Sequence, residues 1–147
     1  MAESIDVNLR SALSSVSESL NKASDALAKR ISDVESALKA YNLGIEMWVD
    51  VYRSMDDGYT TVHRIGYGRH EGKWGLLAAT YVDEDPDETW TQYFLREAPR
   101  DLRLECVDKI PELLEKLVEK GQKIAQQVIA KAEAVGNMAT ALARKAR

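Results

Sequence analysis

Residues 43–52 read LGIEMWVDVY, and at this stretch the periodicity of the sequence changes. Upstream, apolar residues recur every three or four positions, which is typical of an amphipathic helix. Within the stretch, apolar side chains occupy every second position, which is typical of a strand with one buried face. The change therefore predicts a helix before residue 41 and a sheet after it.

The predicted N-terminal helix covers residues 4–40, which contain neither glycine nor proline. Its apolar stripe is close to a heptad seam with one extra residue between Leu27 and Ile31, which locally relaxes a supercoil. Such a stripe predicts that the helix packs against another helix. The candidate assembly residues on it are Leu13, Val16, Leu20, Leu27, Ile31, Val34 and Leu38.

Three further strands are predicted downstream, over residues 59–69, 74–82 and 89–95. Turn sequences separate them: DDG at 56–58, HEGK at 70–73 and the acidic loop DEDPD at 83–87. Short connections between consecutive strands predict an antiparallel meander over residues 43–95. Gly66 and Gly68 fall inside the second strand and predict a bend or bulge there.

A second long helix is predicted over residues 99–144. Pro99 suits a first helical turn, and Pro111 either kinks the helix or starts it afresh, because proline removes an amide donor and crowds the preceding turn. Apolar residues again step by three and four, with Lys131 as the one charged residue on the stripe. The candidate assembly residues here are Ile110, Leu114, Leu117, Ile124 and Val128.

These elements predict a single α+β domain over residues 1–147. At about 1.5 Å per residue the helices are roughly 55 and 65 Å long, whereas strands of eight residues span only about 27 Å. The sheet cannot cover both stripes, so we expect the helices to pair as an antiparallel coiled-coil-like hairpin or a dimeric bundle. A homodimer is the favoured homo-oligomer, and a compact monomer is the alternative.

Composition narrows the class of protein. The chain is 45% hydrophobic and 30% charged, which is typical of folded domains, and its net charge of −4 makes nucleic acid an unlikely partner. A single cysteine, Cys106, excludes a disulfide within the chain and favours the cytoplasm. The N-terminus lacks the pattern of a secretory signal, and no apolar run is long enough for a membrane span.

No motif predicts catalysis, a cofactor or a metal. His63 and His70 lie seven positions apart, which puts them on opposite faces of a regular strand. The residues from Asp83 begin like a calcium loop, but Glu88 and Phe94 stand where that loop needs glycine and glutamate. We therefore predict a non-enzymatic protein with no catalytic, cofactor-binding or metal-binding residues.

Aromatic residues concentrate in the sheet region. Strand alternation places Trp48 and Tyr52 on one face with Glu46 and Asp50, opposite the apolar face. Interfaces favour tryptophan, tyrosine and arginine, so this face and the second turn form a candidate surface for a protein partner of unknown identity. Its residues are Trp48, Tyr52, Arg69, His70, Lys73 and Trp74, and packing within the sheet is the alternative.

The function favoured by these patterns is a structural or protein-interaction module that assembles through its helices. The order of long helix, β-hairpins and long helix resembles that of a prefoldin subunit, which implies paired helices whose apolar tips hold a client protein. A second alternative is contact with nucleic acid or an anionic surface through residues 120–147, which carry a net charge of +5. A third is a small-ligand pocket between sheet and helices, lined by the aromatics.

Overall fold

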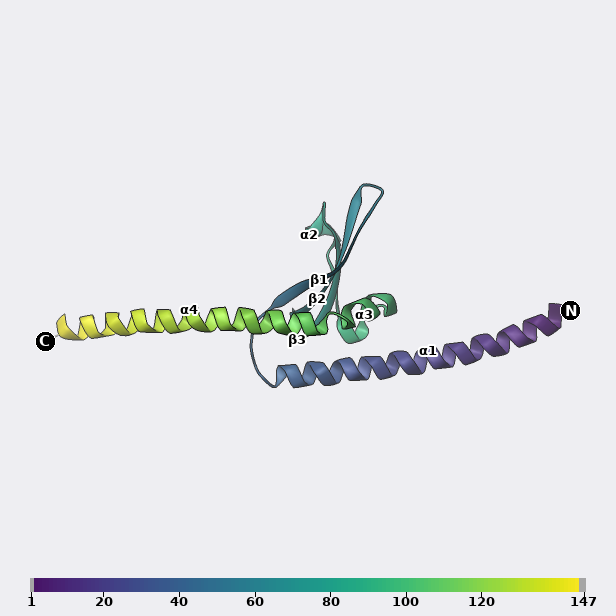
Figure 1. The fold of residues 1–147 in the computed structure, drawn as a ribbon, viewed down its shortest axis with the longest axis horizontal. Coiled ribbons are helices and arrows are strands. Elements are labelled where there is room, and N and C mark those ends of the chain that lie inside the picture. Colours follow the sequence, from purple (N-terminus) through teal and green to yellow (C-terminus); the bar gives the residue numbers. More distant parts are fainter. Residues whose placement is uncertain (1, 146–147) are drawn as a thin grey trace.

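The computed structural model describes residues 2–145 and confirms the α+β class (Figure 1). Two long helices, α1 and α4, accompany an antiparallel sheet with strand order β1-β2-β3-β4. The long elements are α1 (Ala2–Lys39), β1 (Met47–Asp56), β2 (Tyr59–His70), β3 (Lys73–Val82) and α4 (Ile110–Lys145). The short ones are α2 (Pro86–Thr89), β4 (Thr91–Phe94), the 3₁₀ helix η1 (Leu95–Glu97) and α3 (Arg100–Val107).

The predicted meander is confirmed, but its first strand lies later in the chain than predicted. Strand β1 begins at Met47 because residues 40–46 form the connection from α1. In that connection Asn42 and Gly44 adopt positive φ values of 53° and 63°, which ends the helix and turns the chain towards the sheet. The β1–β2 turn contains Asp57 and Gly58, also with positive φ, as its sequence predicts.

The predicted C-terminal helix is divided into α3 and α4, with the break at residues 108–109. Pro111 lies in the first turn of α4, where the missing amide hydrogen would have no partner within the helix. Proline therefore starts a helix here, one of the two outcomes that the sequence leaves open. The break allows α3 to pack Leu102 and Cys106 into the core.

The core lies on one face of the sheet, beneath the second half of α1, α3 and the first turns of α4. Helix α1 contributes Ile31 and Leu38, and α4 contributes Leu113 and Leu117. They pack against sheet residues that are almost fully buried: Val49, Ile65, Tyr67, Leu76 and Ala78. Helices α1, α3 and α4 all contribute to this core, and we call the opposite face of the sheet the open face.

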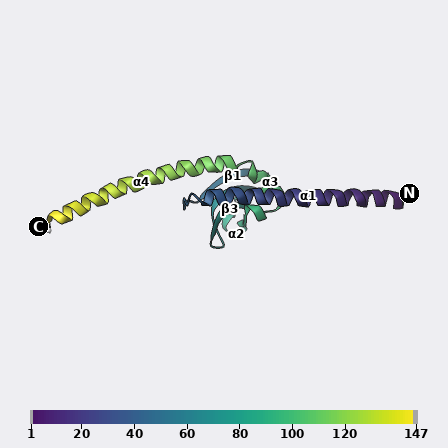
Figure 2. The ribbon, with the colours of Figure 1, turned by 90° about the horizontal axis from the view of Figure 1, so that it is seen from below.

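The remaining parts of α1 and α4 extend away from the sheet in opposite directions (Figures 1 and 2). The last anchoring contact of α1 is the Ser24 carbonyl oxygen, which accepts a hydrogen bond from Arg103 Nη1 at 3.1 Å. On α4 the corresponding contact is the Lys120 ammonium, which donates to the Glu46 carbonyl oxygen at 2.6 Å. We call residues 2–23 the α1 arm, residues 122–145 the α4 arm and the part between them the head.

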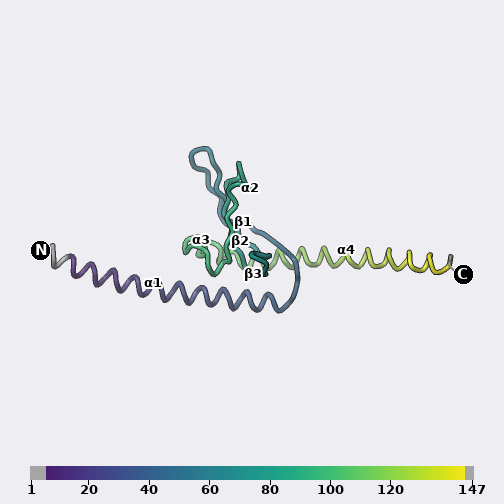
Figure 3. The backbone as a smooth tube through the Cα atoms, turned by 180° about the vertical axis from the view of Figure 1, so that it is seen from behind, coloured from purple at the N-terminus to yellow at the C-terminus, as the bar shows by residue number. Residues whose placement is uncertain are grey.

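The predicted antiparallel hairpin of helices does not form within one chain. Helix α1 runs from one end of the molecule to the sheet, and α4 continues in the same direction from the sheet to the other end (Figure 3). Helix α1 packs on β3 and η1, whereas α4 packs on β1 and β2. Each stripe therefore faces the sheet, and the paired helices implied by the prefoldin resemblance are absent from this part of the chain, residues 2–145. The dimeric bundle stays a prediction.

A buried carboxylate joins α1 to the sheet edge. Strand β4 ends at Phe94, so the Leu76 amide on β3 has no strand partner beyond it. Glu35, only 6% exposed, accepts this hydrogen bond at 2.9 Å and pairs with Arg96 Nη1 at 2.8 Å. Gly75 makes room for this arrangement, because a Cβ atom there would lie 2.7 Å from Glu35 Oε2. Glu35 therefore fixes how α1 sits on the sheet.

We expect Glu35→Ala to lower the free energy of unfolding by about 2–3 kcal/mol, because it leaves the Leu76 amide and Arg96 without their partner. Glu35→Gln should cost less, since its amide oxygen can still accept from Leu76. Urea denaturation measures the change, with Glu18→Ala on the exposed α1 arm as the control. Equal effects of Glu35→Ala and Glu18→Ala would contradict this account of the contact.

Cys106 belongs to α3 and is fully buried, and its thiol donates to the Arg64 carbonyl oxygen at 3.7 Å. Burial, aided by the Glu105 carboxylate, raises the pKa of this thiol to about 12. We expect iodoacetamide at pH 8 to modify Cys106 only in urea, because only the thiolate reacts. Rapid labelling of native protein would show that α3 opens readily.

The native pKa of the Cys106 thiol lies above its ordinary value of 9.0. The stability that this thiol contributes should therefore be present below pH 9 and lost as pH rises towards 12.

Candidate interaction surfaces

The six residues predicted as one interaction surface lie on both faces of the sheet. Trp48 covers Gly66 on the open face, and the His70 ring contacts Phe94 on the same face. Trp74 instead packs against the helix-covered core, with the Arg69 guanidinium 6.0 Å from its ring. The remaining two residues are exposed: Tyr52, on β1, and Lys73, at the β2–β3 turn.

A β-bulge explains why Tyr52 does not share a face with Trp48. The β1–β2 register shifts between Asp50 and Tyr52, leaving Val51 without a partner. One extra residue reverses the alternation beyond it. Tyr52 consequently lies opposite His63, whose ring is 5.4 Å away, on the side of α3. Of the bend or bulge predicted at Gly66 and Gly68, the bulge is excluded, because the pairing of β2 with β3 is regular through both residues.

The open face carries an aromatic cluster of Trp48, Tyr81 and Trp90. The Trp48 and Trp90 rings meet edge to face at 5.3 Å, and Trp90 stacks on Tyr81 at 5.4 Å. Arg64 lies 5.1 Å above the Tyr81 ring and pairs with Asp50 through Nε at 2.6 Å. Gly66 is required beneath Trp48, since a Cβ atom there would lie 2.4 Å from the indole ring. Arg64, Tyr81 and Trp90 are not among the candidate residues of the sequence analysis. The β2–β3 register brings Arg64 beside Tyr81, and Trp90 joins them from the end of α2.

The indole nitrogens of this cluster are already hydrogen-bonded within the chain. Trp48 Nε1 donates to Glu46 Oε1 and Trp90 Nε1 donates to Gln92 Oε1, both at 3.0 Å. A hollow of about 520 Å³ beside the cluster is lined by aromatic rings together with Arg64 and two carboxylates of the acidic loop. The cluster therefore acts first as packing that covers the open face of the sheet.

The acidic loop is held by hydrogen bonds to the β1–β2 hairpin. Asp83 accepts from Arg53 Nη2 at 2.9 Å, and the Glu84 carboxylate accepts from the Thr60 amide at 2.9 and 3.1 Å. This hydrogen bond is the main reason that the pKa of Glu84 is lowered. Residues 2–145 contain no group of three histidine, cysteine or acidic side chains that could hold a metal ion.

The two histidines lie on opposite faces of β2, as predicted. His63 Nδ1 is 2.6 Å from Glu105 Oε2, which links β2 to α3. His70 Nδ1 is 3.1 Å from the Gln92 side-chain nitrogen on the open face. Each ring is therefore engaged by a neighbouring element of the head.

One cavity lies in the region where the sequence predicts a small-ligand pocket between sheet and helices. A cavity of about 140 Å³ lies between the end of α1 and the sheet, lined in part by Tyr67 and Trp74. Ligand pockets commonly measure about 300–1,000 Å³. Burial, followed by the charge of Glu35, raises the pKa of the Tyr67 hydroxyl, so this group stays neutral at physiological pH.

The predicted assembly stripes are divided between the core and the arms. In the head, Ile31, Leu38 and Leu117 are buried, and Leu27, Ile110 and Leu114 are partly buried. The core also uses Leu113, which the sequence analysis did not select. The remaining members are exposed: Leu13, Val16, Leu20 and Val34 on α1, and Ile124 and Val128 on α4.

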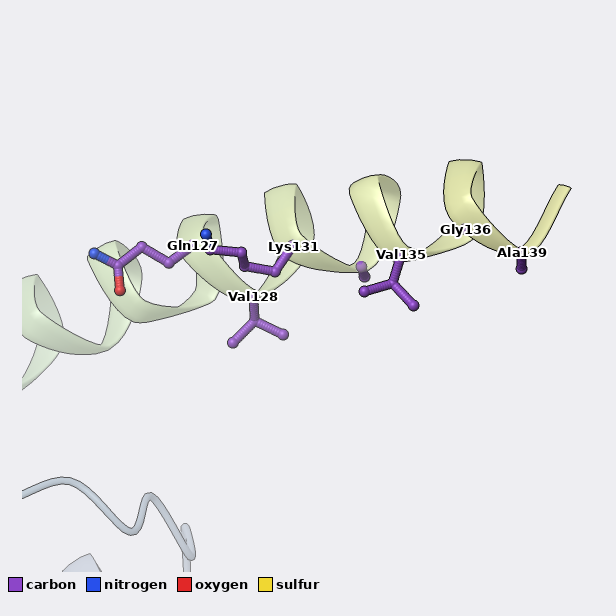
Figure 4. A pocket seen from close by; sticks show the side chains of 7 residues that line it. Gln127, Val128, Lys131, Val135, Gly136 and Ala139 are labelled. Atoms are coloured by element: carbon purple, nitrogen blue, oxygen red, sulfur yellow. The ribbon is translucent and has the colours of Figure 1, made fainter. Parts of the chain in front are cut away.

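The α4 arm presents a groove of about 950 Å³, whose lining residues all belong to this one helix. Val128, Val135 and Ala139 point to the same side of the helix, with Lys131 beside them (Figure 4). The groove is therefore an uncovered helix surface and not an enclosed cavity. On the basic C-terminal segment, Lys123, Lys131 and Arg144 are exposed, and Arg147 lies outside the described residues.

No helix in residues 2–145 is both long enough and apolar enough to cross a membrane. No family model matches the chain, and no solved structure matches it. A segment of 58 residues is 41% identical to part of a solabiose phosphorylase from Paenibacillus borealis. This match covers 37% of the present chain and 7% of that protein, so the chain spans a small fraction of the relative's length.

Proposed function

We propose that this chain is a non-enzymatic structural or protein-interaction module that assembles through its α1 and α4 arms. The observation that carries the proposal is the pair of long apolar stripes that the chain itself does not cover. Leu13 is 67% exposed on the α1 arm, and Val135 is 61% exposed on the α4 arm. A partner that covers these stripes would complete the packing that the head begins.

The physical chemistry of isolated helices supports this role. A single helix is marginally stable in water, and most helical stability in proteins comes from packing of an apolar face. Burial of a large aliphatic side chain contributes about 1.5–3 kcal/mol. Each arm carries several such side chains, and contiguous exposed apolar surface of this kind marks interaction sites. A protein partner along the arms is therefore the simplest source of the missing stabilisation.

The head holds the two arms in fixed positions. Its core anchors both helices, and Glu35, Arg103 and Lys120 fix the points at which the arms leave. On the open face, the indole nitrogens and the His70 ring are engaged by neighbouring side chains. On the helix-covered face, the His63 ring is engaged by Glu105 of α3. These features favour a head that rigidly anchors two arms over a head that contains a catalytic or ligand-binding cleft.

We expect the double variant Leu13→Asp/Val128→Asp to be monomeric, whereas the unmodified protein forms a dimer or larger species. A buried, unpaired charge in an apolar helix interface is strongly unfavourable. Size-exclusion chromatography with light scattering measures the mass. Circular dichroism should show loss of arm helicity, while the near-ultraviolet signal of the tryptophans in the head persists.

The matched control is Ser11→Asp/Gln126→Asp, which adds the same charges to the polar faces of the same arms and should leave the mass unchanged. Leu117→Asp provides a contrast, because Leu117 is buried in the head and its substitution should unfold the chain. A monomeric unmodified protein, or a double variant that keeps its larger mass, would refute assembly through the arms.

A further inference from the structure

We infer that each arm is covered by a second copy of this chain, with the α1 arm of one copy packed antiparallel against the α4 arm of the other. Two such pairs form in one two-fold symmetric dimer. This inference rests on the proposed assembly role and specifies its partner and geometry.

Charge determines which arms can pair. The α4 arm carries Lys123, Lys131, Arg144 and Lys145 against Glu133, a net charge of +3. Two α4 arms side by side would therefore repel each other. The α1 arm carries Glu3, Asp6 and Glu18 against Arg10 and Lys22, a net charge of −1. Pairing of α1 with α4 is the combination that brings charges of opposite sign together.

Length and direction favour the two-fold arrangement. The α1 arm has 22 residues (2–23) and the α4 arm has 24 (122–145), which correspond to about 33 and 36 Å of helix. The arms leave opposite ends of the head (Figure 1). A two-fold axis through the heads, perpendicular to the long direction, reverses one copy and lays each α1 arm along an α4 arm. It also places the N-terminus of α1 beside the C-terminus of α4, where helix dipoles attract.

The stripes correspond when the arms are aligned from their anchoring points. Leu20 lies four residues before Ser24, and Ile124 lies four residues after Lys120, so these two side chains come to the same level. Further out, the level of Leu9 is close to that of Val135. Gly136 stands in the groove with nothing within 4 Å of a Cβ atom built on it. A glycine in a helix costs about 1 kcal/mol relative to alanine, and a closely packed second helix would explain its presence.

The main alternative for the same arm pair is a head-to-tail arrangement. It would place the tip of α1 beside the anchoring point of the next copy's α4, and Leu20 would then approach Leu142 instead of Ile124. Such a contact repeats into a ring or an open chain, whereas the two-fold dimer covers both arms with two copies. The register of the arms therefore distinguishes the two arrangements.

Disulfide trapping tests this register in the full chain. We expect Leu20→Cys/Ile124→Cys to oxidise into a covalent dimer as the main product, while Leu20→Cys/Leu142→Cys stays largely unlinked. The two cysteines of one chain lie on arms that extend in opposite directions, so they cannot join to each other within a chain. Cys106 is buried and does not compete. A covalent ladder from Leu20→Cys/Leu142→Cys would overturn the two-fold dimer in favour of a head-to-tail chain.

Complementation tests the identity of the pairing arms. Leu13→Asp damages one α1 arm and Val128→Asp damages one α4 arm, so we expect each variant alone to be monomeric by light scattering. Their equimolar mixture should regain a dimer, because the intact α1 arm of one variant meets the intact α4 arm of the other. Failure of the mixture to associate, or cross-linking of Leu13→Cys with itself, would overturn α1–α4 pairing.

The light scattering of the unmodified protein separates this inference from the proposed function. A monomer would overturn both. An oligomer that loses its mass in Leu13→Asp/Val128→Asp, but gives no covalent dimer through Leu20 and Ile124, would overturn the two-fold geometry alone. Dissociation that increases with salt would support the charge argument, because screening weakens attraction between exposed opposite charges.

Discussion

A short sheet and two long helices set the main constraint on this molecule. Strands of 10 to 12 residues can bury only part of helices that contain 38 and 36 residues. The covered parts supply the core, with Ile31 and Leu117 among its buried residues. The uncovered parts keep the same helical period and the same apolar character, but they lie beyond the reach of the sheet. The exposed apolar stripes of the two arms follow from this excess of helix length over strand length.

Local patterns in the sequence predicted the elements well. Apolar residues spaced by three and four predicted both long helices, and apolar residues at alternate positions predicted the meander. The turn at Asp57-Gly58 was predicted because these residue types favour positive φ values. The sequence does not predict the relative direction of the two long helices along the sheet. Helices α1 and α4 run the same way along the sheet, and this depends on which strands each helix covers. Periodicity along one helix contains no information about that choice.

The candidate surfaces show the same division. Exposed Leu13 and Val128 were predicted as assembly residues, while Leu117, from the same pattern, belongs to the core. The aromatic cluster on the open face depends on strand register, which pairs Trp48 with Gly66 across β1 and β2. Glu35 is not among the residues that the sequence analysis selects. Its role arises because β4 ends early and leaves the Leu76 amide without a partner, and no local signal in α1 reports the length of a distant strand.

The opposite directions of the arms have a kinetic consequence. The head contains a meander of neighbouring strands with short connections, so its folding is a unimolecular process that closes mainly short loops. Within one folded chain the two arms do not meet, because they leave the head in opposite directions. If the arms are covered by other chains, that step is bimolecular, and its rate scales with concentration while the rate of head folding does not. The time that a newly folded chain needs to find its partner would then depend on the concentration of the protein.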